Sequence, residues 1–119
     1  MSLHRLGSKN FVHQTAIIDD NVTAGEGNYI GPFCYLTGNL EIGNNNRFES
    51  HCTVGTRAEH TEHWHKDGRV IIGDDGTFRD HVSIHAAAAD GLTRIGNCVI
   101  ILNKAYVAHD CIIEDGVTL

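Results

Sequence analysis

The sequence predicts an all-β fold, a single-stranded parallel β-helix, from two features of a six-residue repeat. Cut in sixes from Val12, the chain opens fifteen of its seventeen units with an apolar residue, whereas its 41% hydrophobic composition would give about seven. The fifth residue of a unit is mostly small, and six of the 13 glycines stand second in a unit. A large and a small inward side chain in each unit, with glycine beside the corner, predict a short strand followed by a sharp turn.

Three such units close a triangular coil of eighteen residues, which pairs its backbone with the coils above and below it at a spacing of about 4.8 Å. With a five-residue insertion at 90–94 discounted, the seventeen units predict about six coils, expected to be left-handed as in other hexapeptide-repeat proteins. Residues 12–119 are assigned to the β-helix and residues 1–11 to an N-terminal extension, whose Met1–Leu3 are of the kind an expression vector adds.

The repeat fails at two places, where function is expected, because a stacked coil needs neither a loop nor a histidine. One is the insertion at 90–94. The other is the segment 55–69, where unit-opening positions become His60 and Lys66 and the small position becomes Trp64. None of these side chains fits inside a coil, so a projecting loop is predicted that still uses the eighteen residues of one coil.

Histidines in this loop suggest a metal site, but the pattern favours another interpretation. The segment carries Glu59, His60, Glu62, His63 and His65. No regular strand or helix would fix their geometry, as a metal site requires. We therefore predict no bound metal, and a binding loop that packs Trp64 against a ligand or a neighbouring subunit.

Composition excludes several classes of protein. A net charge of −6 disfavours nucleic acid and anionic membranes as partners. No apolar run is long enough to span a bilayer, and the start lacks a signal peptide, so a cytoplasmic location is predicted. Cys34, Cys52 and Cys111 fall in the small inward position and are expected to be buried and reduced, whereas Cys98 falls at a corner.

One histidine differs from the others because an acid follows it directly. His109 is third in the unit VAHDCI and precedes Asp110, and its unit lies one coil above the unit that contains His85. Tyr106 and Lys104 come shortly before it, so these side chains can gather near one edge. An imidazole beside a carboxylate is suited to act as a general base, although the residues alone are equally compatible with an ordinary surface pair.

From Val12 onward the chain resembles the N-terminal β-helix of the UDP-N-acetylglucosamine 3-O-acyltransferases, which open lipid A synthesis. The matching stretches are VHQTAI near the start, IGPFC at 30–34, RVIIGDDGTFRDHVSIH at 69–85, GLTRIG at 91–96 and AHDC at 108–111. The hexapeptide repeat is shared by many transferases, whereas the placed insertion together with AHDC is more specific to this family.

The resemblance implies that His109 is the general base that takes a proton from a sugar hydroxyl as it attacks an acyl thioester, and that Asp110 orients it. It implies an acyl carrier protein or coenzyme A thioester as donor, a nucleotide sugar as acceptor, no resident cofactor, and a homotrimer with clefts between its subunits. The substrate-binding residues expected beside the pair are His85, Lys104, Tyr106, Glu59, His60 and Trp64.

The chain also departs from the family pattern. Where the family's loop has glutamine, aspartate and lysine, this chain has Glu59, His60 and Glu62, and Tyr106 replaces a family histidine. The later coils are absent after Leu119, so we expect a fragment or a minimal homologue. Two alternatives stay open: an inactive structural trimer, and a zinc protein like the γ-type carbonic anhydrases, with His85 and His109 as ligands and Lys104 in the third position.

Overall fold

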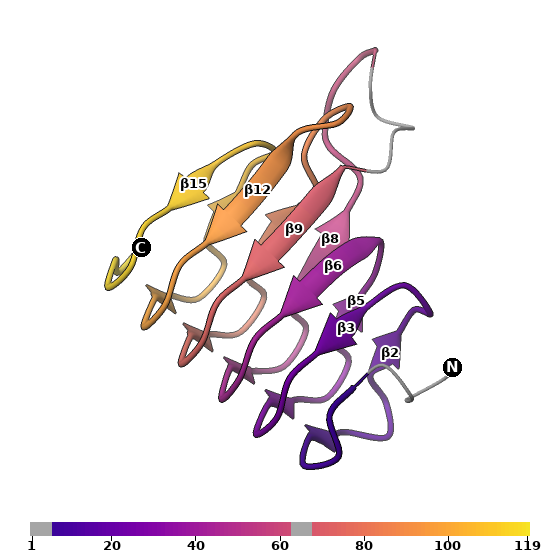
Figure 1. Ribbon diagram of the computed structural model, residues 1–119, viewed down its shortest axis with the longest axis vertical. Coiled ribbons are helices and arrows are strands. Elements are labelled where there is room, and N and C mark those ends of the chain that lie inside the picture. The colour runs from indigo at the N-terminus through magenta and orange to yellow at the C-terminus, as the bar shows by residue number, and fades with distance from the viewer. Residues whose placement is uncertain (1–5, 63–67) are drawn as a thin grey trace.

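The structure, a computed structural model that describes residues 6–62 and 68–119, is a left-handed parallel β-helix of triangular cross-section (Figure 1). The described residues form fifteen short strands in three parallel sheets of five, and the chain visits the three sheets in turn. The fold class predicted from the repeat is therefore confirmed. No helix in the described part of the chain has the length and apolar character needed to cross a bilayer.

Each sheet stacks one strand from every coil. Sheet 1 contains β1 (Phe11–Val12), β4 (Tyr29–Ile30), β7 (Arg47–Phe48), β10 (Thr77–Phe78) and β13 (Ile100–Ile101). Sheet 2 contains β2 (Ile17–Ile18), β5 (Tyr35–Leu36), β8 (Thr53–Thr56), β11 (Ser83–His85) and β14 (Tyr106–Val107). Sheet 3 contains β3 (Thr23–Ala24), β6 (Asn39–Ile42), β9 (Arg69–Ile72), β12 (Leu92–Ile95) and β15 (Ile112–Ile113).

Isolated bridges extend two of the sheets by one rung. Leu6 pairs with Ala24 below sheet 3, and Thr118 pairs with Ile100 above sheet 1. Fifteen strands and two bridges make seventeen rungs, or nearly six coils at three rungs each, as predicted.

Strand register confirms the repeat and corrects the prediction for the loop. Ile30 pairs with Val12, eighteen residues earlier, and Val107 pairs with Ile84, which reflects eighteen residues plus the five-residue insertion. Thr53, however, pairs with Ser83, thirty residues later. The loop therefore adds twelve residues to a complete coil and does not use the residues of one, because the chain leaves sheet 2 after Thr56 and rejoins the ladder of sheet 3 only at Arg69.

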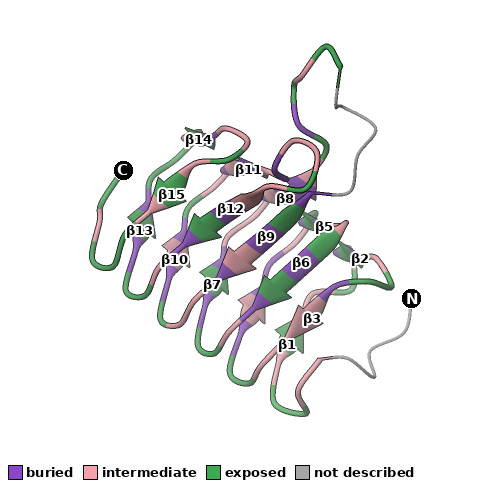
Figure 2. Cartoon of the chain, turned by 45° about the horizontal axis from the view of Figure 1, so that its top comes forward, coloured by how far each residue is buried: buried purple, intermediate pink, exposed green. Residues whose placement is uncertain are grey.

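The core is the column of large residues that open the units, alternating with small residues. The rings of Phe48 and Phe78, both fully buried, stack at its centre with centroids 4.6 Å apart. Cys34 and Cys52 are buried as predicted. Cys111 packs against the core only partly buried, since it lies in the last coil, and Cys98 is exposed. Figure 2 shows buried and exposed residues alternating along the strands.

Buried asparagines join the coils along one edge of the core, a feature that the apolar repeat does not reveal. Asn10 Oδ1 accepts the backbone N–H of Asn28 at 2.9 Å, and Asn28 Oδ1 accepts that of Asn46 at 2.8 Å. Asn46 Oδ1 then accepts the N–H of Gly76 at 2.8 Å. Each asparagine thus replaces water for a backbone group at a turn that leaves the sheet ladder.

Candidate functional site

All interruptions of the repeat emerge at one corner of the prism, the corner between sheets 2 and 3, here called corner 2–3. The long loop at 57–68 joins β8 to β9, and residues 86–91 join β11 to β12. The five-residue insertion therefore lies within 86–91 and not at 90–94 as predicted, because Leu92–Arg94 belong to β12. One coil further on, residues 108–111 join β14 to β15. The AHDC sequence therefore lies next to the insertion and on the same side as the loop, which projects from the prism in Figure 1.

His109 and Asp110 form the closest pair at this corner. His109 Nδ1 lies 2.7 Å from Asp110 Oδ2, and the backbone N–H of Ala88 donates to the same oxygen at 3.0 Å. The backbone N–H of Asp110 donates to Thr93 Oγ1 at 2.9 Å. The insertion and β12 thus hold the aspartate in place, and the aspartate holds the imidazole.

Electrostatics keep this carboxylate ionised. Partial burial acts to raise the pKa of Asp110, but hydrogen bonds from His109 and from the Ala88 N–H act in the opposite direction, and the net pKa lies below its ordinary value. A carboxylate at Nδ1 favours the tautomer with its proton on Nδ1. The Nε2 atom of His109 is then left as a proton acceptor, which is the requirement for a general base.

Thr93 and Gly91 support the pair, and neither was predicted. Thr93 is fully buried and pairs with Val70 in the ladder of sheet 3, at a position where a neighbouring coil has Leu40. A Cβ added at Gly91 would overlap Asp110 Oδ1, so the glycine leaves room for the carboxylate. A polar residue in an otherwise apolar inward column is the sequence signal that identifies Thr93.

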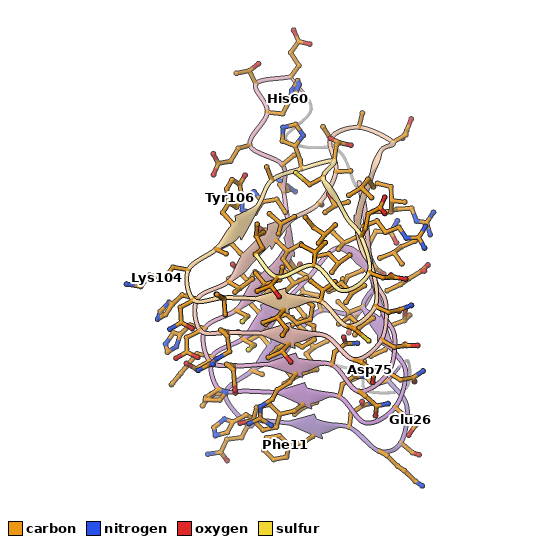
Figure 3. All side chains as sticks on the ribbon, turned by 90° about the vertical axis from the view of Figure 1, so that its left-hand side faces the viewer. Phe11, Glu26, His60, Asp75, Lys104 and Tyr106 are labelled. Atoms are coloured by element: carbon orange, nitrogen blue, oxygen red, sulfur yellow. The ribbon has the colours of Figure 1, made fainter. Side chains whose placement is uncertain are left out.

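The loop brings a second imidazole to the pair. The rings of His60 and His109 meet edge to face, with centroids 5.7 Å apart and an interplanar angle of 74°. Figure 3 shows His60 on the projecting loop at one end of the molecule, beyond Tyr106. Glu59, its exposed neighbour, is close enough to influence the pKa values of both His85 and Tyr106.

His85 and Tyr106 form a second pair one strand away. Their rings lie edge to face with centroids 4.8 Å apart, and Tyr106 Oη is 3.4 Å from His85 Nδ1, a long hydrogen bond. Burial lowers the pKa of His85 and raises that of Tyr106, so His85 favours its neutral form and Tyr106 keeps its proton. His109 also lowers the pKa of His85, which reflects the proximity of the two pairs.

Lys104 is not brought to His109 within the described chain. Lys104 lies at the corner between sheets 1 and 2, on the opposite edge of β14, and in Figure 3 its side chain points away from the body. It continues a column of residues in left-handed backbone conformation, with φ between 59° and 64°: Phe33, His51, His81 and Lys104. Trp64 lies outside the described residues.

A metal site is not formed by the described side chains. Within residues 6–62 and 68–119, no group of three or more histidine, cysteine, aspartate or glutamate residues is arranged to hold a metal ion. His63 and His65 fall outside these ranges, so the interpretation of the loop histidines stays a prediction.

Comparisons with known proteins identify the class. A family model for the bacterial transferase hexapeptide, six repeats, matches residues 25–56. An acyl-[acyl-carrier-protein]–UDP-N-acetylglucosamine O-acyltransferase of Syntrophobacter fumaroxidans is 38% identical over 106 residues, which are 87% of this chain and 41% of that protein. The chain is therefore a hexapeptide-repeat protein similar to bacterial transferases.

Solved structures of similar proteins include UDP-N-acetylglucosamine acyltransferases. The UDP-N-acetylglucosamine acyltransferase of Francisella novicida is 28% identical with a TM-score of 0.63, over 95% of this chain and 46% of that one. The enzyme of Bacteroides fragilis is 25% identical with a TM-score of 0.68, over 95% and 49%. The chain is thus similar to the N-terminal part of the UDP-N-acetylglucosamine acyltransferases, as its motifs predicted, and it spans less than half the length of these relatives.

Proposed function

We propose that this chain provides the general base of an acyltransferase that moves an acyl group from a thioester to a nucleotide sugar. The observation that carries the proposal is the 2.7 Å contact between His109 Nδ1 and Asp110 Oδ2, which leaves Nε2 free to accept a proton. The relatives are named for transfer from acyl carrier protein to UDP-N-acetylglucosamine, which gives the substrate class. Coenzyme A is the alternative carrier of the thioester.

The pair is suited to each proton transfer that the reaction needs. His109 Nε2 takes the proton of the sugar hydroxyl or amine as that atom forms a bond to the thioester carbonyl carbon. The C–S bond then breaks, and the imidazolium returns the proton to the departing thiolate. Asp110 accepts the Nδ1–H throughout and stabilises the positive imidazolium between the two transfers.

Neighbouring side chains would bind the acceptor. Tyr106 keeps its hydroxyl proton and can donate a hydrogen bond, and neutral His85 beside it can accept or donate one. Glu59 and His60 approach from the loop, and we assign Trp64 to the same loop contact.

A homotrimer would complete the site. The side chains of His109 and Asp110 are 30% and 40% exposed, so the pair lies on an outer surface and not in an enclosed cavity. Lys104 lies at the next corner, and in a closed threefold assembly it would approach the pair of a neighbouring subunit. The free cysteines of the described core and the nucleotide-sugar substrate both suit the cytoplasm, where we place the protein.

The zinc-enzyme alternative has less support. It would need a third ligand where Lys104 stands, a position that carries no imidazole. A protonated lysine also cannot bind zinc. The similar proteins named above are acyltransferases, which favours transfer over hydration of carbon dioxide.

Thiol release from an acyl thioester, measured with and without UDP-N-acetylglucosamine, tests the proposal. Transfer should depend on the nucleotide sugar and fall about 10²–10⁴-fold in the variant His109→Ala. His81→Asn is the matched control, because it removes an exposed histidine at another corner and Asn tolerates the φ of 62° found there. Full activity in the variant His109→Ala would refute the assigned base. If the wild-type chain itself transferred no acyl group, an inactive structural trimer would be the better description.

A further inference from the structure

A groove of about 510 Å³ lies lower on corner 2–3, between the loop and the N-terminal coils. We call it the lower groove. Its lining residues are Asp19, Tyr35, Thr37, Gly38, Asn39, Gly55, Thr56, Arg57, Gly68 and Ala86. Neither His109 nor Asp110 is among them, although both lie on the same corner.

The lower groove extends along the prism from Asp19 to Ala86, so its Asp19 end is the part that is distant from the candidate base. Asp19 follows β2 and His109 follows β14, and sheet 2 places β5, β8 and β11 between these two strands. Four rungs at about 4.8 Å put roughly 19 Å between the two positions. The lining contains no histidine or cysteine.

One carboxylate is held in place on the wall of the groove. Asp19 Oδ2 accepts hydrogen bonds from the hydroxyl of Thr37 and, at 3.2 Å, from that of Tyr35. Both donors come from the next coil, so the carboxylate is fixed before a ligand arrives. An ionised carboxylate has about four acceptor sites, and Oδ1 is left to accept hydrogen bonds from a ligand.

The other features of the groove define the shape of that ligand. Tyr35 is 37% exposed and presents an aromatic surface beside the carboxylate. Gly38, Gly55 and Gly68 line the groove through backbone atoms alone. A volume near 510 Å³ falls in the range of small-molecule sites, about 300–1,000 Å³.

We propose that the lower groove binds a hydroxylated ring, such as a hexose, with its hydroxyls donating to Asp19 and one face against Tyr35. A carboxylate that accepts from hydroxyl donors is matched by a polyol, and charge-assisted hydrogen bonds are the stronger ones. A ring with a single hydroxyl could contact the aromatic surface of Tyr35, but it would have only one O–H group to donate to Asp19. The proposal does not depend on the transfer chemistry assigned to His109.

Titration of the ¹⁵N-labelled chain with glucose, followed in amide correlation spectra, tests the proposal. Glucose should cause saturable shifts in the amide signals of Thr37 and Thr56, and cyclohexanol, with a single hydroxyl, should not. Asp19→Asn should weaken binding about tenfold or more, since hydrogen bonds to charged groups are worth about 1.5–3 kcal/mol. Tyr35→Ala should abolish saturation, and Tyr35→Phe, which keeps the ring, should weaken it less.

Two controls keep the outcomes separate. Asp75→Asn changes an exposed acid at a different corner, visible in Figure 3, where φ of 61° suits Asn, and it should leave glucose binding unchanged. His109→Ala should remove acyl transfer and leave glucose binding intact, so failure of one proposal does not imply failure of the other. Shifts that stay linear with glucose concentration, or equal binding by Tyr35→Ala and the wild type, would overturn the proposal.

Discussion

Asp110 Oδ2 lies 2.7 Å from His109 Nδ1 and accepts the backbone N–H of Ala88 through the same oxygen. Both contacts can survive in Asp110→Asn if the amide oxygen takes the place of Oδ2, but the negative charge is lost. The imidazolium that forms during transfer is then less stable. We expect kcat for acyl transfer to fall about 10²-fold or more with little change in KM, as measured by steady-state thiol release.

Asp110→Ala separates charge from positioning. It removes the partner of both Nδ1 and the Ala88 N–H, so the loss of activity should exceed that of Asp110→Asn. Equal activity in the wild type and both variants would show that the contact is an ordinary surface pair.

The lowered pKa of His85 leads to a prediction of how the stability of the fold depends on pH. Burial lowers its pKa in the folded chain, opposed by Glu59, so below the ordinary value near 6.5 the unfolded chain binds more protons at this site. His85 therefore contributes no penalty above about pH 6.5 and a growing one as the pH falls further. Urea unfolding at pH 7.5 and 5.5 should show a larger loss of stability in the wild type than in His85→Asn.

The other titrating groups are common to both chains, so the comparison isolates one histidine. An identical loss of stability in the two chains on acidification would contradict the burial of His85.

The six-residue repeat determined most of the fold in advance because a coil has one inward pattern. Apolar residues at unit openings such as Ile30 and Phe48 fix both the strand period and the core. The length of the loop could not be predicted in the same way. A hexad with His60 in the opening position shows that the chain leaves the core, but does not tell how many residues complete the coil, which only the pairing of Thr53 with Ser83 determines.

The candidate site was predictable in part for the same reason. Register placed His85 and His109 one coil apart, and adjacency paired His109 with Asp110. Lys104 was expected near the same edge, but within one chain it lies at the preceding corner, between β13 and β14. Thr93 was missed, since its role comes from contact with a backbone group seventeen residues away.

Gly55 occupies a position where we expect no side chain to be tolerated. It has φ of +91°, and an added Cβ would overlap the carbonyl oxygen of Thr37 in the coil below. Backbone strain and overpacking should together destabilise Gly55→Ala by about 3 kcal/mol or more. Urea unfolding followed by circular dichroism measures this change in the free energy of unfolding.

Gly116→Ala is the matched control. Gly116 also has a positive φ, +74°, but an added Cβ there would have no atom within 4 Å. Only backbone strain applies, about 1–2 kcal/mol. Equal effects of the two substitutions would show that the contact with Thr37 does not limit the position.

The contacts of Asn46 allow us to predict how much the buried asparagine ladder contributes to stability. Its side chain is 1% exposed, accepts the N–H of Gly76 and donates to the carbonyl of Gly73, both at 2.8 Å. Asn46→Ala leaves two backbone groups without partners, and each costs about 1–3 kcal/mol. We expect a loss of roughly 2–5 kcal/mol in urea unfolding, whereas alanine at exposed Asn21 should change stability by about 0.5 kcal/mol at most. If the loss of stability at Asn46 were no larger than at Asn21, water would be replacing the amide. The asparagine ladder would then be a result of the close packing of the coils and would not stabilise the fold.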